Sequence, residues 1–396
     1  DHVHRGAIRP EVVRHDHLWL TIPVAILLLV FAAQHHGILR TARIQTIMGL
    51  AAIIPLLIVG VVPLLTGDVL AENLVPLAPL GFDNDGNVIP GVWDKGGWTL
   101  FMGGLFIAAW SAYAFETAIY YTSEFRDPAT DTYKAIFYAG VLCLVIYTLV
   151  PLSFQGTLGV ERMMEPGIVD GWGVADAMAW MVGGGSFIHG LLVVMLILAL
   201  LLAVMTSMAG SSRTLYQGSV DGWLPRYLTK VNQHGAPTRA MWTDLSFNLV
   251  LLMMSDYLFV LAVSNCCYLI FNFLNLNAGW IHRIDSKDVK RPWRCPTPLM
   301  AAGIVLSFVN MALLGAGANV WGEGTLMSGV IAAALIVPVF CYRHFYQDKG
   351  QFPPDMLKDL HLEGRDLSVR KAGVWPYVAI AAGITVAIVA NQVFTL

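Results

Sequence analysis

The sequence is poor in charged residues, and it lacks the short motifs that mark soluble enzymes. Only 13% of its 396 residues are Asp, Glu, Lys or Arg, whereas 56% are hydrophobic. Soluble domains carry about a quarter charged residues, so this balance indicates a membrane protein. No Gly-rich phosphate loop, nucleophile elbow or HExxH pattern occurs, which predicts that the protein is not an enzyme. A net charge of −3 without a basic arm gives no indication of nucleic-acid binding.

Patterns typical of metal sites and disulfides are missing as well. The chain has five cysteines, none in CxxC spacing, and they lie in or beside apolar runs. We therefore interpret them as small buried hydrophobic residues rather than as disulfides or zinc ligands. Four histidines lie in the N-terminal tail, at His2, His4, His15 and His17. A membrane enzyme with a metal in this tail is one alternative, but we expect no cofactor and no bound metal.

Ten apolar runs are long enough, or nearly so, to cross a bilayer as helices. A membrane core needs about 20 apolar residues in helical form. The predicted spans are 17–36, 46–65, 99–122, 134–155, 187–212, 240–254, 257–281, 298–318, 325–345 and 374–394. The sixth is short, and only Ser255-Asp256 separates it from the seventh, as in a tight helical hairpin. The expected fold class is an all-α integral membrane protein with about ten transmembrane helices.

The distribution of Lys and Arg predicts the orientation of these helices. When the loop after the first span is placed in the cytoplasm, the external loops contain only Lys95 and Arg162. Three more of the 24 cations lie in the N-terminal tail, and all the others fall in cytoplasmic segments. Because cytoplasmic loops are enriched in Lys and Arg, this asymmetry settles the topology and places the C-terminus outside.

A carboxylate inside a predicted membrane span is the sharpest functional signal in the chain. Glu116 stands about two turns inside the span 99–122, among the aromatic residues Trp110, Tyr113 and Phe115. An unpaired charge at the membrane centre costs about 2.5–3.5 kcal/mol on insertion scales, so intramembrane carboxylates are functional by default. Glu116 is therefore either a group in a transport pathway or a protonated carboxyl that ties helices together by hydrogen bonds.

A cluster of hydroxyl groups lies near the end of the span 187–212. It consists of Thr206, Ser207 and Ser211. Small hydroxyl residues late in a membrane helix either line a cation site or allow close packing against a partner helix. Both interpretations stay open for these three residues.

A polar stripe follows one face of the span 257–281. Asn265, Tyr268, Asn272 and Asn275 are separated by three, four and three positions, which places them on the same side of a helix. Such a stripe does not face lipid, so we expect it to line a pathway or to make hydrogen bonds between helices.

Residues 205–240 read MTSMAGSSRTLYQGSVDGWLPRYLTKVNQHGAPTRA and contain three motifs in series. A small-residue helix end with Ser-Arg is followed by DG-x-LP and then by KVN-x-x-G-x-P-x-x-A. The residues are Ser212, Arg213, Asp221, Gly222, Leu224, Pro225, Lys230, Val231, Asn232, Gly235, Pro237 and Ala240. This series resembles the signature of the amino acid–polyamine–organocation permeases. The loop 291-RPWRCP-296 is similar to the family's RP-F-x-x-P, and the stretch from Trp110 resembles its sixth helix, F-x-G-x-E.

The resemblance covers about residues 17–345 and implies the five-plus-five inverted-repeat transporter fold of the leucine-transporter type. In that fold the substrate is held in the middle of the membrane at broken helices. The first span then corresponds to the family's fourth helix, so this chain would lack three helices and half of the substrate site, and would not transport alone. The expected organisation is a tail 1–16, where a truncation would lie, a core 17–345, a cytoplasmic linker 346–373 and an extra membrane helix 374–396.

The resemblance also implies a substrate site on the sixth family helix. Family members cover the substrate with an aromatic residue at the position of Trp110, and they often carry an acid at the position of Glu116, a gating or proton-coupling group. The expected substrate-binding residues are Trp110, Ser111, Tyr113, Ala114 and Phe115, with Asn265 and Asn272 lining the vestibule. The possible cation or hydrogen-bond ligands are Thr206, Ser207 and Ser211.

Two positions depart from the family pattern. Ala114 stands where the family usually has Gly, so local unwinding of the helix is less favoured there. Ala52, three residues before Pro55, stands where many proton-coupled members carry a Lys. The coupling ion, H⁺ or Na⁺, therefore stays open.

The sequence thus predicts a secondary active transporter for an amino acid or related amine, working by alternating access. We expect it in the plasma or inner membrane, with the small-molecule substrate and the lipid bilayer as its partners and no nucleic acid. The oligomeric state is not indicated. The alternative is a membrane sensor or scaffold that keeps the transporter fold without transport activity.

Overall fold

A computed structural model of the chain describes residues 16–36, 38–82, 88–113, 115–253, 257–287, 289, 291, 293–359 and 371–394. Within these ranges, the side chains of residues 16–20, 38–42, 82, 88, 115, 116, 123 and 359 are outside the description. The predicted tail, the hairpin residues Ser255 and Asp256, and Ala114 therefore lie outside the described residues, as do the side chains of Phe115 and Glu116.

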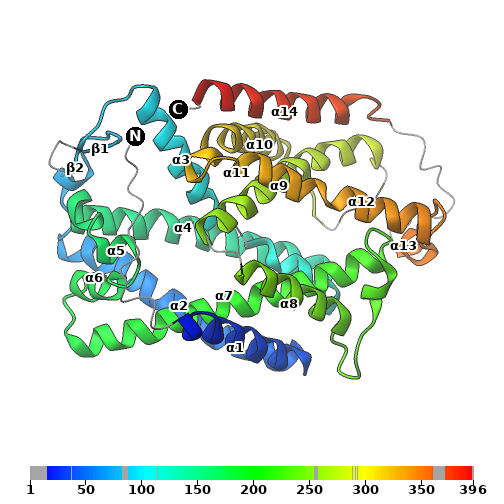
Figure 1. Ribbon diagram of the computed structural model, residues 1–396, viewed down its shortest axis with the longest axis horizontal. Coiled ribbons are helices and arrows are strands. Elements are labelled where there is room, and N and C mark those ends of the chain that lie inside the picture. Colours follow the sequence, from blue (N-terminus) through cyan, green and yellow to red (C-terminus); the bar gives the residue numbers. More distant parts are fainter. Residues whose placement is uncertain are drawn as a thin grey trace.

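Nearly all of the described chain is helical, and most helices run along the long axis of the molecule (Figure 1). The α-helices are α1 Asp16–His35, α2 Ile38–Thr66, α3 Lys95–Ser111, α4 Pro128–Met163, α5 Pro166–Val169, α6 Val174–Met181, α7 Ser186–Val220, α8 Thr238–Leu252, α9 Tyr257–Asp285, α10 Thr297–Gly317, α11 Thr325–Ala334, α12 Ile336–Cys341, α13 Pro354–Asp359 and α14 Trp375–Phe394. Tighter or wider turns form η2 Ala71–Leu74, η3 Phe115–Glu124, η4 Arg226–Thr229, η5 Ala318–Trp321 and the π-helix η6 Tyr342–Gln347. The strands β1 Leu80–Phe82 and β2 Val88–Pro90 pair antiparallel, with Leu80 opposite Pro90.

Among the described residues, seven helices are long and apolar enough to cross a membrane. They coincide with seven of the ten predicted spans. The other three spans correspond to the 20-residue α1, the 15-residue α8 and the segment 99–122. The last is divided between two elements, because α3 ends at Ser111 and the 3-10 helix η3 begins at Phe115. The fold is that of an all-α membrane protein.

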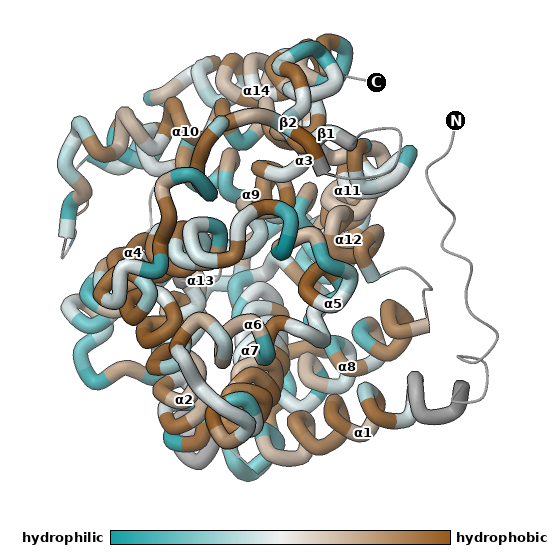
Figure 2. Tube along the Cα trace, turned by 90° about the vertical axis from the view of Figure 1, so that its left-hand side faces the viewer, coloured by the Kyte–Doolittle hydropathy of each residue, from teal (hydrophilic) through white to brown (hydrophobic). Residues whose placement is uncertain are grey.

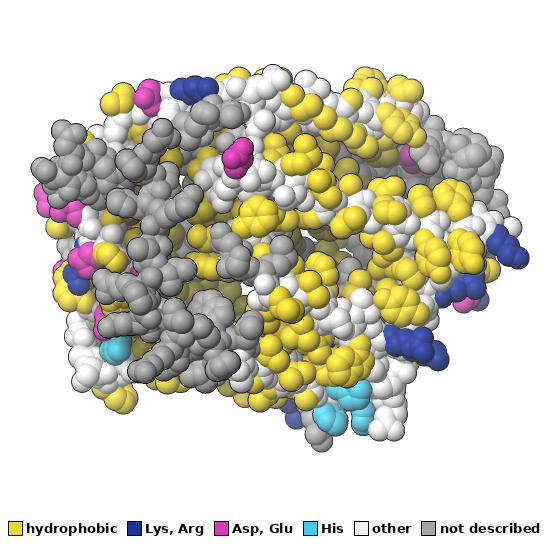
Figure 3. Space-filling model, viewed as in Figure 1, with side chains coloured by type: hydrophobic (Ala, Val, Ile, Leu, Met, Phe, Trp, Pro, Cys, Tyr) yellow, Lys and Arg dark blue, Asp and Glu magenta, His cyan; other side chains and the backbone are white. Residues whose placement is uncertain are grey.

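Charge and hydropathy separate the membrane-embedded part from the two ends. Lys and Arg side chains gather mainly toward the end of the molecule that carries α13, and Asp and Glu mainly toward the opposite end (Figure 3). The tube is hydrophobic along most of the helices, with hydrophilic residues mostly in the turns between them (Figure 2). The end of α14 lies at the same end of the molecule as β1 and β2, two strands of a loop that is predicted to be external (Figure 1). This placement agrees with the external C-terminus predicted from the cations.

A buried ion-pair network holds the cytoplasmic loop after α7 against the end of η6. Asp348 accepts hydrogen bonds from Arg343 Nε and Arg226 Nη2, both at 2.5 Å. The Arg343 side chain is almost fully buried and also donates to the carbonyl of Leu224 at 2.7 Å. The DG-x-LP motif, which contains Leu224, is therefore part of a structural anchor at the cytoplasmic face.

Replacing Asp348 with Asn is expected to lower the free energy of unfolding by about 3–5 kcal/mol, because Arg343 would lose its counter-charge in a buried position. Burial disfavours the ionised carboxyl, but hydrogen bonds and charge from Arg343 and Arg226 outweigh it and hold the pKa of Asp348 below its ordinary value. This contribution to stability is therefore complete above the ordinary Asp pKa of about 4 and is lost as pH falls through the lowered folded pKa.

Thermal unfolding of the purified protein in detergent, followed into the acid range, tests this prediction. The wild type should lose stability in acid more steeply than Asp348→Asn. Asp355→Asn, at an exposed position on α13, is the matched control and should behave as the wild type. Equal melting temperatures of Asp348→Asn and the wild type at neutral pH would contradict the role assigned to the network.

Candidate functional site

The helix that contains the predicted substrate-binding segment is interrupted. The last turns of α3 tighten, because the N–H of Ala112 donates to the Ala109 carbonyl at 3.1 Å and that of Tyr113 to the Trp110 carbonyl at 3.3 Å. Donor and acceptor in these bonds are three positions apart, as in a 3-10 helix, rather than four, as in an α-helix. The 3-10 helix η3 follows from Phe115. A ten-residue 3-10 helix is unusually long, and such stretches often mark a functional hinge.

Aromatic side chains flank this interruption. Tyr113 stacks on Tyr268 of α9 with ring centroids 4.0 Å apart and planes 15° from parallel. Trp110 is 46% exposed, and Ser111 beside it is also exposed. Trp110, Ser111 and Tyr113 therefore lie together at the end of α3. Tyr268, part of the predicted polar stripe, joins them from another helix.

Asn265 attaches α9 to α3 just before the interruption. Its side chain is fully buried, and Nδ2 donates to the carbonyl of Phe106 at 2.6 Å. Asn272, two turns further along α9, is half-buried, and Asn275 is exposed. The stripe thus runs from a buried contact with α3 to the surface of the described residues.

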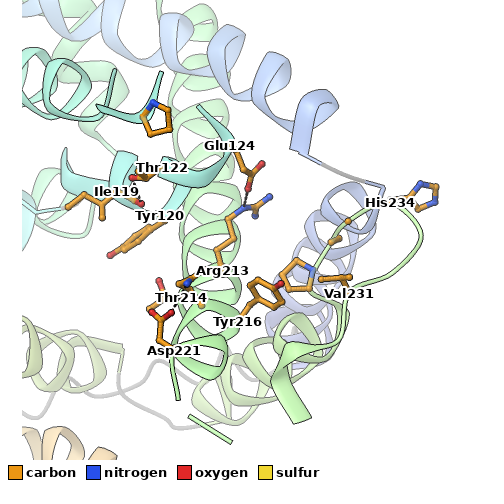
Figure 4. Close-up of a pocket in the computed structure, with 16 residues that line it drawn as sticks. Ile119, Tyr120, Thr122, Glu124, Arg213, Thr214, Tyr216, Asp221, Val231 and His234 are labelled. Atoms are coloured by element: carbon orange, nitrogen blue, oxygen red, sulfur yellow. Dashed lines mark hydrogen bonds and ion pairs between the residues drawn. The ribbon is translucent and has the colours of Figure 1, made fainter. Parts of the chain in front are cut away.

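A pocket of about 900 Å³ lies on the cytoplasmic side of the interruption, between η3, α7 and the loop 221–237 (Figure 4). Its lining residues are Ile119, Tyr120, Thr122, Glu124, Pro128, Arg213, Thr214, Tyr216, Gln217, Gly218, Asp221, Val231, His234, Gly235, Ala236 and Pro237. None of the predicted site residues is among them. Several residues of the 205–240 signature are, so the signature builds the walls of this pocket.

Arg213 and Glu124 form an ion pair across the pocket. Arg213 Nε donates to Glu124 Oε1 at 2.7 Å, and Figure 4 shows the two side chains meeting between η3 and α7. Arg213 Nη1 also donates to the Ala209 carbonyl at 3.1 Å, and its guanidinium lies 5.0 Å from the centre of the Tyr121 ring. Two contacts of the guanidinium, with Glu124 and with the Tyr121 ring, therefore tie η3 to α7, and the bond to Ala209 fixes the guanidinium on its own helix.

Close packing supports the same junction. A Cβ on Gly210 would lie 2.7 Å from the ring of Tyr120, so only glycine lets η3 approach α7 this closely. Small residues of this kind allow close packing between membrane helices.

Asn232 organises the loop that closes the pocket. Its Oδ1 accepts hydrogen bonds from the backbone N–H groups of His234 and Ala236, each at 2.9 Å. Its Nδ2 donates to the carbonyl of His35 at the end of α1, also at 2.9 Å. Gly235 has φ +75°, which favours glycine. The KVN-x-x-G motif therefore has a structural explanation as a folded loop fixed to α1.

The predicted hydroxyl cluster lies on α7, within about two turns before Arg213. Thr206 donates to the Leu202 carbonyl at 2.8 Å and Ser211 to the Met208 carbonyl at 3.2 Å, whereas Ser207 is exposed. Ser211 also lies within hydrogen-bond reach of the carboxyl of Asp244 on α8.

The sequence analysis did not single out Asp244. This carboxyl is 7% exposed and belongs to the predicted span 240–254. The signal was an acid within an apolar run, the same signal that drew attention to Glu116. In the part of the chain that the structure describes, no group of three or more His, Cys, Asp or Glu residues is placed to hold a metal ion.

Comparison with known proteins gives one family. A family model described as "Amino acid permease" matches residues 6–324, which is most of the chain. The polyamine transporter PUT1 of Oryza sativa subsp. japonica is 24% identical over 304 residues, covering 71% of this chain and 55% of the relative. The branched-chain amino acid permease BcaP of Bacillus subtilis (strain 168) is 21% identical over 316 residues, covering 78% of this chain and 62% of the relative. The matched part of this chain spans less than two thirds of either relative.

Proposed function

Because the chain belongs to the amino acid permease family, within the amino acid–polyamine–organocation superfamily, we propose that the complete protein is a secondary active transporter that works by alternating access. The proposed substrate is an amino acid or a related amine. The family is one of transporters rather than enzymes, and the apolar helices make the protein a multi-pass membrane protein. We propose the plasma or inner membrane as its location, which cell fractionation would test.

The interruption between α3 and η3 is the observation that carries this proposal. Ends of helices leave backbone N–H and C=O groups without intrahelical partners, and inside a membrane such groups are tolerated where they line a cavity or contact a ligand. In transporters of this architecture, broken helices hold the substrate near the membrane midplane. Trp110 and Tyr113 stand at this interruption, which makes it the proposed substrate site.

The aromatic residues at the interruption suit a substrate with an amino group. A cation over an aromatic ring gains about 0.5–2 kcal/mol, more when water is excluded. Trp110 and the stacked pair Tyr113 and Tyr268 supply such rings. The two relatives are named as transporters of polyamines and of branched-chain amino acids, and both of these substrate classes carry an amine.

We place the inner gate at the contact of Arg213 with Glu124. The pocket on this side is large enough to admit a small amine, and the ion pair spans it between η3 and α7. Movement of η3 away from α7 would break the pair and open the pocket toward the proposed site. Formation of the pair would close it.

Counterflow of labelled substrates in proteoliposomes containing the complete protein tests the proposal. Amino acids and polyamines are supplied in turn on one side, with unlabelled compound on the other. Exchange of at least one amine-bearing compound is the expected result. Binding without exchange across the whole panel would refute the transporter and support the alternative, a membrane sensor that keeps the transporter fold.

Replacing Glu116 with Gln is expected to flatten the pH dependence of uptake, because an amide cannot take up and release a proton. The proposal for this residue is a gating or proton-coupling role, with H⁺ or Na⁺ as the coupling ion. Uptake by the reconstituted protein is measured across the pH range, with Glu161→Gln, at an exposed position in the last turn of α4, as control. An unaltered profile at normal expression would leave Glu116 as a carboxyl that only ties helices together.

A further inference from the structure

The last helix, α14, lies beyond the part of the chain that the family model matches, which ends at residue 324. It packs mainly against α10 and also contacts α9 and α3 (Figure 1). Its inner side joins the apolar core, where Val386 and Ala387 pack beside Phe106 of α3 and Leu314 of α10. The proposed transport cycle does not require a helix at this position, so its contacts need another explanation.

Glycines in the interface of α14 with α10 and α9 permit very close approach of these helices. A Cβ on Gly315 of α10 would lie 2.0 Å from the carbonyl oxygen of Ala387. A Cβ on Gly383 of α14 would lie 2.4 Å from the ring of Phe273 on α9. Contacts of this kind bring helix backbones together inside membranes and leave little freedom for one helix to slide along another.

Polar bonds fasten both ends of α14. At the cytoplasmic end, the N–H of Ala372 donates to Asp285 Oδ1 at 2.7 Å. At the external end, the Thr99 hydroxyl of α3 lies 2.9 Å from the carbonyl oxygen of Phe394, and Thr99 is 1% exposed. The same hydroxyl proton is shared with the Lys95 carbonyl at 2.8 Å. The last carbonyls of a helix lack intrahelical partners. The Thr99 hydroxyl therefore supplies a hydrogen bond that a carbonyl at this end of α14 would otherwise lack in a buried position.

The helix fastened in this way is the outer half of the interrupted helix. Thr99 lies in the first turns of α3, and the proposed substrate site lies at its other end. The α10–η5 unit holds α3 as well, because Trp321 Nε1 donates to the Gly103 carbonyl at 2.9 Å. Asn319 of η5 in turn donates to Asn391 of α14 at 3.2 Å. Any tilt of α3 would therefore be transmitted to α14.

We propose that α14 is an accessory brace for α3, the outer half of the interrupted helix. Thr99 is the positioning residue through which α14 sets the orientation of α3. The proposal rests on the transport function given above, since α3 is the external half of the proposed substrate site. Without the brace, α3 must be ordered by the substrate itself, which weakens binding from outside. Binding from inside, which involves η3 and α7, is unaffected.

Thr99→Val removes the hydroxyl and keeps the shape of the side chain. We expect it to raise the KM for substrate supplied from outside by about 3- to 10-fold, with the KM from inside unchanged, since coupling residues of this kind act over such a range. Thr99→Ser, which keeps the hydroxyl, should restore the wild-type KM. The control is Thr385→Val on the exposed side of α14, where the hydroxyl bonds only within its own helix. Removal of residues 373–396 should raise the KM for substrate supplied from outside at least as much as Thr99→Val does.

Hydrogen exchange of the α3 amides gives a readout that does not depend on transport. Thr99→Val should exchange faster in residues 95–111 than Thr385→Val does. Unchanged exchange, or an equal KM change on both sides, would overturn the brace. Faster exchange in a protein that catalyses no counterflow would refute the proposed transport function and leave the brace standing.

Discussion

Arg213→Ala is expected to reduce counterflow by about 30-fold. Truncating one partner of a buried, hydrogen-bonded charge pair costs about 2–5 kcal/mol, and 1.4 kcal/mol corresponds to tenfold. The Glu124 side chain is 33% exposed, so the lower end of this range, about 2 kcal/mol, applies. The variant also loses the contact with the Tyr121 ring, so η3 keeps only its packing contacts with α7, such as that of Tyr120 with Gly210.

Exchanging the two charged residues distinguishes the effect of the ion pair from the effect of the size of the arginine side chain. The double variant with Glu124→Arg and Arg213→Glu should recover part of the activity, whereas each single change should not. Arg239→Ala, at an exposed position on the cytoplasmic side, is the matched control and should transport normally. Wild-type counterflow by Arg213→Ala would show that the pair is not a gate.

Trp110→Ala is expected to raise the KM at least tenfold with a smaller change in the maximal rate. The indole is the largest side chain at the interruption of the helix, and it is 46% exposed in the described residues, which leaves its face accessible to a substrate. Loss of a cation–π contact and of the apolar contact area together removes about 1.5–3 kcal/mol. Trp110→Phe should retain most of the affinity, because the aromatic face remains.

Direct binding of labelled substrate to protein in detergent, together with counterflow kinetics, checks this result. Trp172→Ala, in the external segment and well exposed, is the control for a general effect of removing an indole. An unchanged KM in Trp110→Ala would exclude this residue as the cap over the substrate and would move the proposed site away from the end of α3.

Much of the architecture could be predicted because it depends on local properties. Whether a run such as 46–65 or 298–318 crosses the membrane follows from the summed hydropathy of consecutive residues. Orientation follows from where Lys and Arg stand between the runs. The family match over residues 6–324 bears out the resemblance found in the 205–240 motifs. Of the predicted spans, 99–122 differs from the structure, because it is divided between α3 and η3, whereas α1 and α8 are as long as the runs 17–36 and 240–254.

The candidate site was only partly predictable. Trp110 and Tyr113 were expected near a break in the helix, but Ala114 in place of glycine argued against local unwinding. The chain nevertheless leaves the α-helix before that position, at Ala112. The preference for three-residue hydrogen bonds there accompanies a contact from another helix, the bond of Asn265 to the Phe106 carbonyl. Sequence spacing carries no information about such a contact between segments 159 positions apart.

The sequence by itself determined that this protein lies in a membrane and to which family it belongs, because both are written in neighbouring residues. Only the tertiary structure decided that Glu124 meets Arg213 across 89 positions, that Asp244 lies beside Ser211, and that Thr99 reaches the end of α14. Each of these polar groups is wholly or largely removed from water, so its partner is selected by the packing of helices. Helix packing depends on side-chain shape along whole faces and is not visible in a single stretch of sequence.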